Sequence, residues 1–429
     1  MPIKILEALC ATSTLVARKQ ISFDTTTGLI VSVDELKRLK SEVDFYFDDD
    51  CLLFGAMGDI HIHAREDSSG LNNYKEDFNS ACCAAINGGV LHLGDMPNNP
   101  IPPIDDQSYL DKVSLAQNSK IPILMYAGIG PTTKPLSFKV PYKVYMGPSI
   151  GELYFKNNVE LEQALVHYKD QWVSFHCEDP QILEQNKMAP DHFLRRPIEA
   201  ECLATDFALK LIDQFQLKGK LCHYSAGIGL DSIRIARKKG INVTCEVTPQ
   251  HLYFSEEDIL KMPTDVQIQF QMNPPIRKRE DRLKLLTALK NHQIDFLATD
   301  HAPHSEEEKA NGMSGMPGLD TYGPFVTWLL LEKNIPAQTM ALICSENPGL
   351  FFNQFLEDLS KKRGMPHKWG LGMGFLAPGY SASFTILNIK KPITFTKDHL
   401  LSKAAWSPFL GVTFPGSLET VFLSGQRLF

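Results

Sequence analysis

The chain has 429 residues, a formal net charge of −7 and a hydrophobic fraction of 43%. These values allow one large α/β domain with a small appendage and a substantial core. The absence of a long Lys or Arg block argues against a nucleic acid partner, and the most apolar stretch, 325–331, is far shorter than the roughly 20 residues of a membrane span. Nine cysteines without a Cys-x-x-Cys pair, and a start at 1–7 unlike a signal peptide, predict a cytoplasmic protein with reduced thiols that acts on small molecules.

Eight short apolar runs alternate with amphipathic segments along the middle of the chain. The runs have the length of buried strands and lie at 57–63, 89–96, 121–127, 142–146, 172–177, 220–224, 241–247 and 295–299. The predicted helices between them include 74–87, 161–169, 198–215, 230–239 and 281–292, with Gly88, Gly219 and Gly240 as predicted helix ends. This alternation predicts a (β/α)8 TIM-type barrel over residues 56–373, with a doubly wound parallel sheet as the alternative.

The two ends of the chain differ from its middle. Residues 1–55 and 374–429 are rich in β-branched and turn residues, as in 382–387 and 419–425. We expect them to form one small β-rich, sandwich-like domain built from both termini.

Residues that bind metals stand at the ends of several predicted strands. His61 and His63 are two residues apart, so one strand presents both to the same face. Two surface histidines would also explain this pair, but further ligand-type residues in the other strands are hard to explain by packing. The carboxyl ends of barrel strands meet at one face, and zinc accepts such nitrogen and oxygen ligands. The set is large enough for two metals and comprises His61, His63, Lys143, His176, His223 and Asp300.

Several of these residues have a structural alternative when taken alone. A strand lysine such as Lys143 is often snorkelling or salt-bridged, and an Asp at a strand end such as Asp300 often caps the next helix. Asn98 lies in a Pro-Asn-Asn-Pro turn, where asparagine is common for local reasons. We expect four further histidines to be structural or exposed, namely His92, His167, His251 and His292.

Six motifs make the chain resemble the dihydroorotases of the amidohydrolase superfamily, and the resemblance extends from residue 1 to residue 429. They are Gly58-Asp59-Ile60-His61-Ile62-His63-Ala64-Arg65, Met96-Pro97-Asn98, Tyr142-Lys143-Val144-Tyr145-Met146-Gly147, Glu246-Val247-Thr248-Pro249, Asn273-Pro274-Pro275-Ile276-Arg277 and Asp300-His301-Ala302-Pro303-His304. The last motif, together with Arg65 and Asn98, is the most specific to dihydroorotases.

The resemblance implies a centre with two zinc ions. Lys143 would bridge them as a carbamate, formed when CO2 adds to its neutral amine, because two nearby cations disfavour the ammonium form. Asp300 would also be the catalytic base that takes a proton from the attacking hydroxide and delivers it to the leaving ring nitrogen. The remaining ligands would be His61 and His63, with Asp300, on one ion and His176 and His223 on the other.

The resemblance also implies a reaction, the reversible closure of N-carbamoyl-L-aspartate to dihydroorotate with loss of water, which is the third step of pyrimidine synthesis. Arg65 would bind the substrate carboxylate, since a guanidinium matches a carboxylate with two parallel hydrogen bonds. Other substrate contacts would come from Asn98 and His304 to the carboxylate, and from Asn273 and the backbone around Ser314 and Gly315 to the ring amides. A homodimer is expected from the resemblance alone.

The chain departs from the family pattern in two places. Arg65 is followed by Glu66 and Asp67, where dihydroorotases usually have a proline and a glycine shortly after, so two extra carboxylates flank the predicted carboxylate site. The segment 147–151 lacks the paired threonines of one dihydroorotase branch, and we assign it no catalytic role.

Two other functions compete with dihydroorotase. A different cyclic amidase, such as a hydantoinase or allantoinase, would share the metal ligands but not the carboxylate site, and Arg65 and His304 argue against it. A catalytically silent scaffold for a carbamoyltransferase would have no chemical need for six metal ligands.

Overall fold

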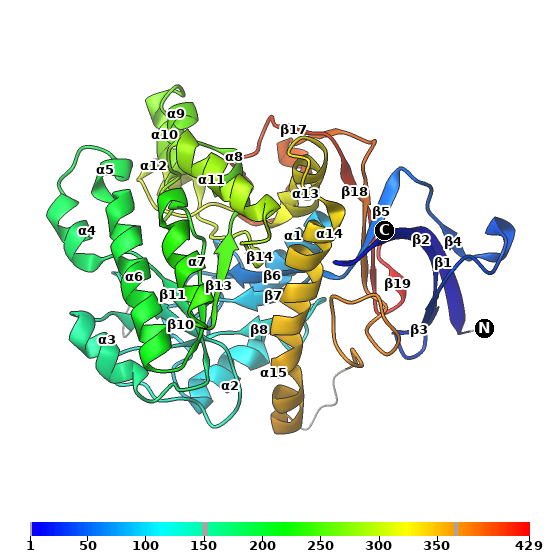
Figure 1. The fold of residues 1–429 in the computed structure, drawn as a ribbon, viewed down its shortest axis with the longest axis horizontal. Helices are drawn as coiled ribbons and strands as arrows, with labels where there is room; N and C mark the ends of the chain where they lie inside the picture. The colour runs from blue at the N-terminus through cyan, green and yellow to red at the C-terminus, as the bar shows by residue number, and fades with distance from the viewer. Residues whose placement is uncertain (1, 148–152, 364–367) are drawn as a thin grey trace.

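The computed structural model describes residues 2–147, 153–363 and 368–429. Figure 1 shows a parallel-stranded part with its helices and, beside it, a sheet in which the blue and red ends of the chain meet. The predicted segment 147–151 falls almost wholly outside the described residues.

Parallel strands follow one another in chain order through the middle of the protein. A three-stranded sheet contains β6 (Met57–Ile62), β7 (Val90–Asp95) and β8 (Ile123–Met125). A six-stranded sheet contains β9 (Ala127–Gly128), β10 (Tyr142–Tyr145), β11 (Trp172–His176), β12 (Lys218–Leu221), β13 (Val243–Val247) and β14 (Phe296–Leu297). Each of the eight predicted strand ranges therefore overlaps a strand, although β12 begins two residues before its predicted range.

Two contacts connect these sheets. Only Tyr126 separates β8 from β9, and its backbone N–H donates to the carbonyl of Asp95 at 2.9 Å. At the other end of the strand order, Ile62 forms an isolated parallel bridge with His301, and the N–H of His63 donates to the His301 carbonyl at 2.8 Å. The first strand thus lies beside the segment that follows the last one.

The helices lie between and after these strands. They are α1 (Phe78–Gly88), α2 (Asp106–Leu115), α3 (Asn158–Leu165), α4 (Pro180–Asn186), α5 (His192–Arg195), α6 (Ile198–Gln214), α7 (Leu230–Lys238), α8 (Pro249–Tyr253), α9 (Glu256–Ile259), α10 (Thr264–Gln267), α11 (Arg279–Lys290), α12 (Glu306–Ala310), α13 (Tyr322–Leu331), α14 (Ala337–Ala341) and α15 (Asn347–Arg363). The predicted helix 74–87 begins later than expected because the Asp77 side chain accepts the N–H of Ser80 and caps α1.

One of the predicted helix ends was wrong, that at Gly219. Gly88 is the last residue of α1, and Gly89, with φ of 86°, is the left-handed residue that ends it. Gly219 lies inside β12, where an added Cβ would come within 2.2 Å of the Ile212 side chain on α6. That glycine permits the close packing of a helix on a strand, a requirement that local sequence does not reveal.

A third sheet joins the two termini, as predicted. It contains β1 (Ile3–Ala11), β2 (Val16–Asp24), β3 (Leu29–Asp34), β4 (Phe45–Tyr46), β5 (Cys51–Gly55), β15 (Phe384–Asn388), β18 (Ser417–Leu423) and β19 (Gln426–Arg427). The N-terminal and C-terminal parts meet where β5 pairs with β15 antiparallel, over a separate apolar cluster that includes Phe23, Phe384 and Phe422. A short antiparallel pair, β16 (Ile393–Thr394) and β17 (Thr413–Phe414), lies outside this sheet.

No helix within the described ranges is long and apolar enough to cross a membrane. All nine cysteines are free thiols.

Candidate metal and substrate site

The structure brings the predicted metal ligands together at the carboxyl ends of the parallel strands. One group consists of His61, His63 and Asp300, whose ligand atoms lie within 4.8 Å of one another. The Nε2 atoms of His61 and His63 lie 3.3 and 3.0 Å from one carboxylate oxygen of Asp300. Burial lowers the pKa of both histidines well below the usual range, so neutral rings offer lone pairs to a cation, while burial raises the pKa of Asp300 to about 7.

The other two predicted histidines form a second group beside the first. Nδ1 of His176 lies 2.9 Å from Nε2 of His223, and the His223 ring centroid lies 5.2 Å from that of His61. Burial, followed by the charge of His176, lowers the pKa of His223 well below its usual range. Two ring nitrogens turned toward one another are suited to share a cation.

Lys143 is completely buried, and its Nζ has no hydrogen-bond partner among the described residues. A buried polar atom without a hydrogen-bond partner calls for an explanation, and a bound group can supply one. With the neutral histidines and Asp300, this side chain completes a donor set that fits divalent cations, and zinc in particular.

Each of three metal-site histidines uses its other ring nitrogen to contact an oxygen of a polar side chain. Such contacts fix the tautomer and the ring orientation of a ligand. The pairs are His61 Nδ1 with Glu246 at 2.6 Å, His63 Nδ1 with Asn98 Oδ1 at 2.7 Å, and His176 Nε2 with Glu178 at 2.8 Å. Asn98 therefore fixes the orientation of the His63 ring through its side-chain oxygen.

The two buried carboxylates behind these histidines are each paired with a cation. Lys220 contacts Glu246, and Arg196 contacts Glu178 through two nitrogens. Although His61, Cys222 and Glu246 also lie within metal-binding distance, Lys220 already neutralises this carboxylate, and we assign it to orienting His61.

Sequence reasoning missed Glu178 and named Glu246 only as part of a family motif, without a role. Glu178 follows His176 by two residues, and Glu246 lies near the end of the buried strand β13.

Arg65 lies next to the metal-site residues and is buried. Its Nε donates to the carbonyl of Pro303 at 3.3 Å, and its Nη2 lies 3.1 Å from Nε2 of His304. Burial lowers the pKa of this guanidinium, and the charges of Asp300, Asp95 and Glu308 raise it, although none of these carboxylates forms an ion pair with Arg65 among the described residues. Glu308, 3.5 Å from the other ring nitrogen of His304, is paired with Lys75 at 2.7 Å.

Three site residues have left-handed backbone conformations. The φ angles of Arg65, His223 and Asp300 are 64°, 36° and 48°. Such conformations are costly for residues other than glycine and occur often at functional sites.

The two carboxylates after Arg65 accept hydrogen bonds from backbone N–H groups. Glu66 accepts the N–H of Phe78 at 2.7 Å, and Asp67 accepts the N–H of Ile101 at 2.9 Å. The carboxylates of Glu66 and Asp67 therefore stabilise the loops and do not pair with Arg65.

The remaining predicted substrate residues lie on loops at the same face. Asn273 has a buried side-chain oxygen without a partner among the described residues. The N–H of Gly315 already donates to the carbonyl of Gln271 at 2.9 Å, so this amide is engaged within the protein. Ser314 lines a cavity of about 760 Å³ together with Arg196.

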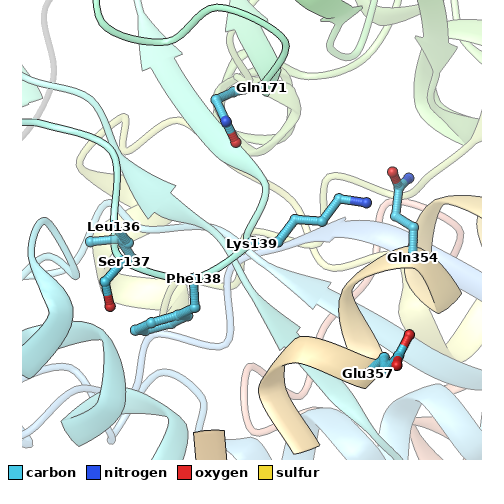
Figure 2. Close-up of a pocket in the computed structure, with 7 residues that line it drawn as sticks. All are labelled: Leu136, Ser137, Phe138, Lys139, Gln171, Gln354 and Glu357. Carbon is cyan, nitrogen blue, oxygen red and sulfur yellow. The ribbon is translucent and has the colours of Figure 1, made fainter. Parts of the chain in front are cut away.

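A different cavity, of about 450 Å³, lies at the opposite ends of the strands. Figure 2 shows its lining from the loop before β10, from Gln171 just before β11, and from Gln354 and Glu357 of α15. None of the predicted site residues lines this cavity.

The fold defines the class of protein. The chain matches an L-hydantoinase (dihydropyrimidinase) from Arthrobacter aurescens with a TM-score of 0.84 and 20% identity, covering 99% of this chain and 95% of that chain. A D-hydantoinase matches with a TM-score of 0.81 and 20% identity, over 99% and 95% of the two chains. The chain thus shares its fold with these hydantoinases.

Proteins that are similar in sequence identify the family within this class. A dihydroorotase from Methanosarcina mazei is 30% identical over 381 residues, which cover 82% of this chain and 78% of the relative. A dihydroorotase from Pyrococcus furiosus is 28% identical over 398 residues, 92% of this chain and 86% of the relative, and one from Bacillus subtilis is 28% identical over 387 residues, 86% and 85%. No family model matches the chain. The chain belongs to the dihydroorotase family.

Proposed function

We propose that this protein is a dihydroorotase that reversibly converts N-carbamoyl-L-aspartate to dihydroorotate and water. The observation that carries the proposal is a buried guanidinium, Arg65, beside His304 and within reach of the metal-site residues. An anionic substrate supplies the carboxylate that this guanidinium lacks in the described chain. The dihydroorotase relatives support the same function.

We further propose that the parallel strands close into a (β/α)8 barrel over residues 56–373, with residues 1–55 and 374–429 as the small β domain. The contacts of Tyr126 with Asp95 and of His63 with His301 support closure. The cytoplasmic location stays a prediction from the cysteines and the N-terminal sequence, and the homodimer stays a prediction from the resemblance.

Two zinc ions would be held by the six predicted ligands, with Lys143 as a bridging carbamate. When bound, they would supply an activated water nucleophile and polarise the scissile carbonyl. The unpartnered, buried Nζ of Lys143 and the converging histidine nitrogens support this arrangement.

The chain's own side chains would perform the remaining steps. Arg65 and His304 would fix the substrate carboxylate, with the Asn98 amide nitrogen as a third donor, and thereby place the ring amide next to Asp300. Asp300 would accept a proton from the attacking water and deliver it to the ring nitrogen as the C–N bond breaks. Asn273 and the backbone around Ser314 would contact the ring amides.

Turnover by the purified protein tests this function. We expect hydrolysis of dihydroorotate and its formation from N-carbamoyl-L-aspartate, with two zinc ions bound per chain and little turnover of hydantoin or allantoin. Faster turnover of hydantoin or allantoin would identify another cyclic amidase. Absence of turnover in a zinc-loaded protein would favour the scaffold alternative.

A further inference from the structure

Tyr145 carries a buried hydroxyl that the fold leaves without a partner. It is the last residue of β10, two residues beyond Lys143, so both side chains point to the same face of the strand. Its residue is 7% exposed, and its hydroxyl makes no hydrogen bond to any described residue. Buried polar atoms of this kind call for an explanation, because most of them are hydrogen-bonded.

Most other buried tyrosines pair their hydroxyls within the protein, whereas the hydroxyl of Tyr224, next to His223, also lacks a partner among the described residues. The hydroxyls of Tyr109, Tyr126 and Tyr322 donate to backbone carbonyls at 2.9 Å, and that of Tyr142 accepts the N–H of Leu136 at 2.8 Å. A phenylalanine at position 145 would fill the same apolar space without leaving a polar atom unpaired. The hydroxyl of Tyr145 therefore serves no visible structural purpose.

The surroundings of Tyr145 belong to the candidate site. Its ring centroid lies 5.3 Å from Nζ of Lys143 and 6.1 Å from the ring centroid of His176. The charged groups of Asp300 and Arg65 also act on its hydroxyl. The side chain thus lies beside the reacting end of the site, among the metal-site residues and the guanidinium.

We propose that the Tyr145 hydroxyl donates a hydrogen bond to the carbonyl oxygen of the substrate amide as that carbonyl is attacked, an inference that rests on the proposed hydrolysis of a cyclic amide. As the attacking oxygen bonds to the carbonyl carbon, the π electrons move to the carbonyl oxygen. The hydrogen bond from Tyr145 stabilises this charge, and Tyr145 keeps its proton throughout. The C–N bond then breaks, and the nitrogen receives the proton carried by Asp300.

A donor that acts on developing charge has a distinct kinetic effect. Its removal lowers kcat with little change in KM, because the interaction forms mainly in the transition state. Loss of one such donor typically costs about 10²- to 10³-fold in kcat. Removal of an unpartnered buried hydroxyl leaves stability unchanged or raises it.

The test compares Tyr145→Phe with Tyr142→Phe in the zinc-loaded protein. Tyr142 lies on the same strand and is buried, but its hydroxyl is already hydrogen-bonded to Leu136. We expect Tyr145→Phe to lower kcat about 10²-fold or more, with unchanged zinc content, similar KM and no loss of thermal stability. Tyr142→Phe should show the opposite, a melting temperature lower than that of the parent protein and an unchanged kcat.

Two outcomes for Tyr145→Phe overturn the proposal, namely an unchanged kcat, or a raised KM with unchanged kcat. Turnover by the parent protein separately tests the proposed function. If the parent protein hydrolyses a cyclic amide other than dihydroorotate, kcat of Tyr145→Phe is compared with kcat of the parent on that substrate. The comparison still holds, because both substrates contain the amide carbonyl that is attacked. A parent protein that hydrolyses no cyclic amide overturns both proposals.

Discussion

A buried guanidinium without a carboxylate partner sets Arg65 apart from the other charged residues of the candidate site. Arg196 and Lys220 are both neutralised by buried glutamates. Arg65 instead contacts a neutral ring nitrogen and a carbonyl oxygen, and the carboxylates of Asp300, Asp95 and Glu308 act on its charge without a direct ion pair among the described residues. At the scale of single residues, this difference supports the proposal that Arg65 binds the substrate, whereas Arg196 and Lys220 hold the glutamates behind the histidines.

Replacing Arg65 with Met should weaken the use of anionic substrate and leave the metals bound. A charge-assisted pair contributes about 1.5 to 3 kcal/mol, so kcat/KM for dihydroorotate should fall roughly 10- to 150-fold. A neutral cyclic imide has no carboxylate to lose, and its slow hydrolysis should hardly change. Equal losses on both substrates, or loss of zinc, would give Arg65 a structural role instead.

Replacing Lys143 with Ala should remove metal and activity together, because the proposed carbamate is a shared ligand. A short carboxylic acid at high concentration should restore part of the turnover by occupying the position of the carbamate. Zinc content and steady-state rates measured with and without acetate test this expectation. A Lys143→Ala protein that keeps two metals and normal turnover would contradict the ligand role.

At the scale of secondary structure, Glu246 links three strands of the parallel part. It stands in β13, contacts the ring of His61 from β6, and accepts the backbone N–H of His223, just after β12, at 2.9 Å. Its other oxygen contacts Lys220 within β12. One carboxylate thus holds two metal-site histidines in register.

Replacing Glu246 with Gln should destabilise the protein and weaken metal binding. Breaking a buried ion pair leaves Lys220 without its counter-charge and costs roughly 3 to 5 kcal/mol, while loss of a partner behind a ligand costs about 10- to 100-fold in metal affinity. Urea unfolding of the metal-free protein and a zinc titration measure the two effects.

A double variant separates the two effects of Glu246→Gln. Adding Lys220→Met should recover part of the lost stability, because it removes the unpaired ammonium, without restoring zinc affinity. The exposed carboxylate of Glu162, paired with Lys210 at 3.1 Å, gives the control Glu162→Gln, whose effect should be small. Wild-type stability and zinc affinity in Glu246→Gln would show that Glu246 has neither function.

At the scale of the whole molecule, buried neutral histidines make stability depend on pH. Burial lowers the pKa of His92 to about 3 and that of His192 and His251 to about 4, against an ordinary value of 6.5. The unfolded chain therefore binds protons at these positions before the folded protein does. The contribution of these histidines to the free energy of unfolding is fully present above pH 6.5. It is lost as the pH falls from about 6.5 toward 4.

The variant His251→Asn should reduce this dependence on pH. A lowering of the pKa from 6.5 to about 4 corresponds to roughly 3 kcal/mol that disappears on acidification. Urea midpoints of the metal-free protein at pH 7.5 and 5 should differ less for the variant than for the parent. The exposed His292 supplies the control His292→Asn, which should keep the parent's difference, and an equal difference in all three proteins would contradict the role of His251.

Local pattern was enough to predict much of this protein. The eight strand positions and the pairing of the two termini follow from apolar periodicity and β-branched composition, which act over a few residues at a time. The same holds for His61 and His63, because two residues on one strand face share their surroundings whatever the rest of the fold. His176, His223 and Asp300 could be predicted because the carboxyl ends of parallel strands converge.

The tertiary structure decided what lies behind and between these residues. Glu246 is 185 positions from His61, and Glu66 and Asp67 turn to backbone amides of other segments rather than to Arg65. Gly219 is required by a side chain of α6 and not by a helix end. Such contacts join residues far apart in the sequence, and their geometry arises only when the strands pack, so no spacing along the chain encodes them.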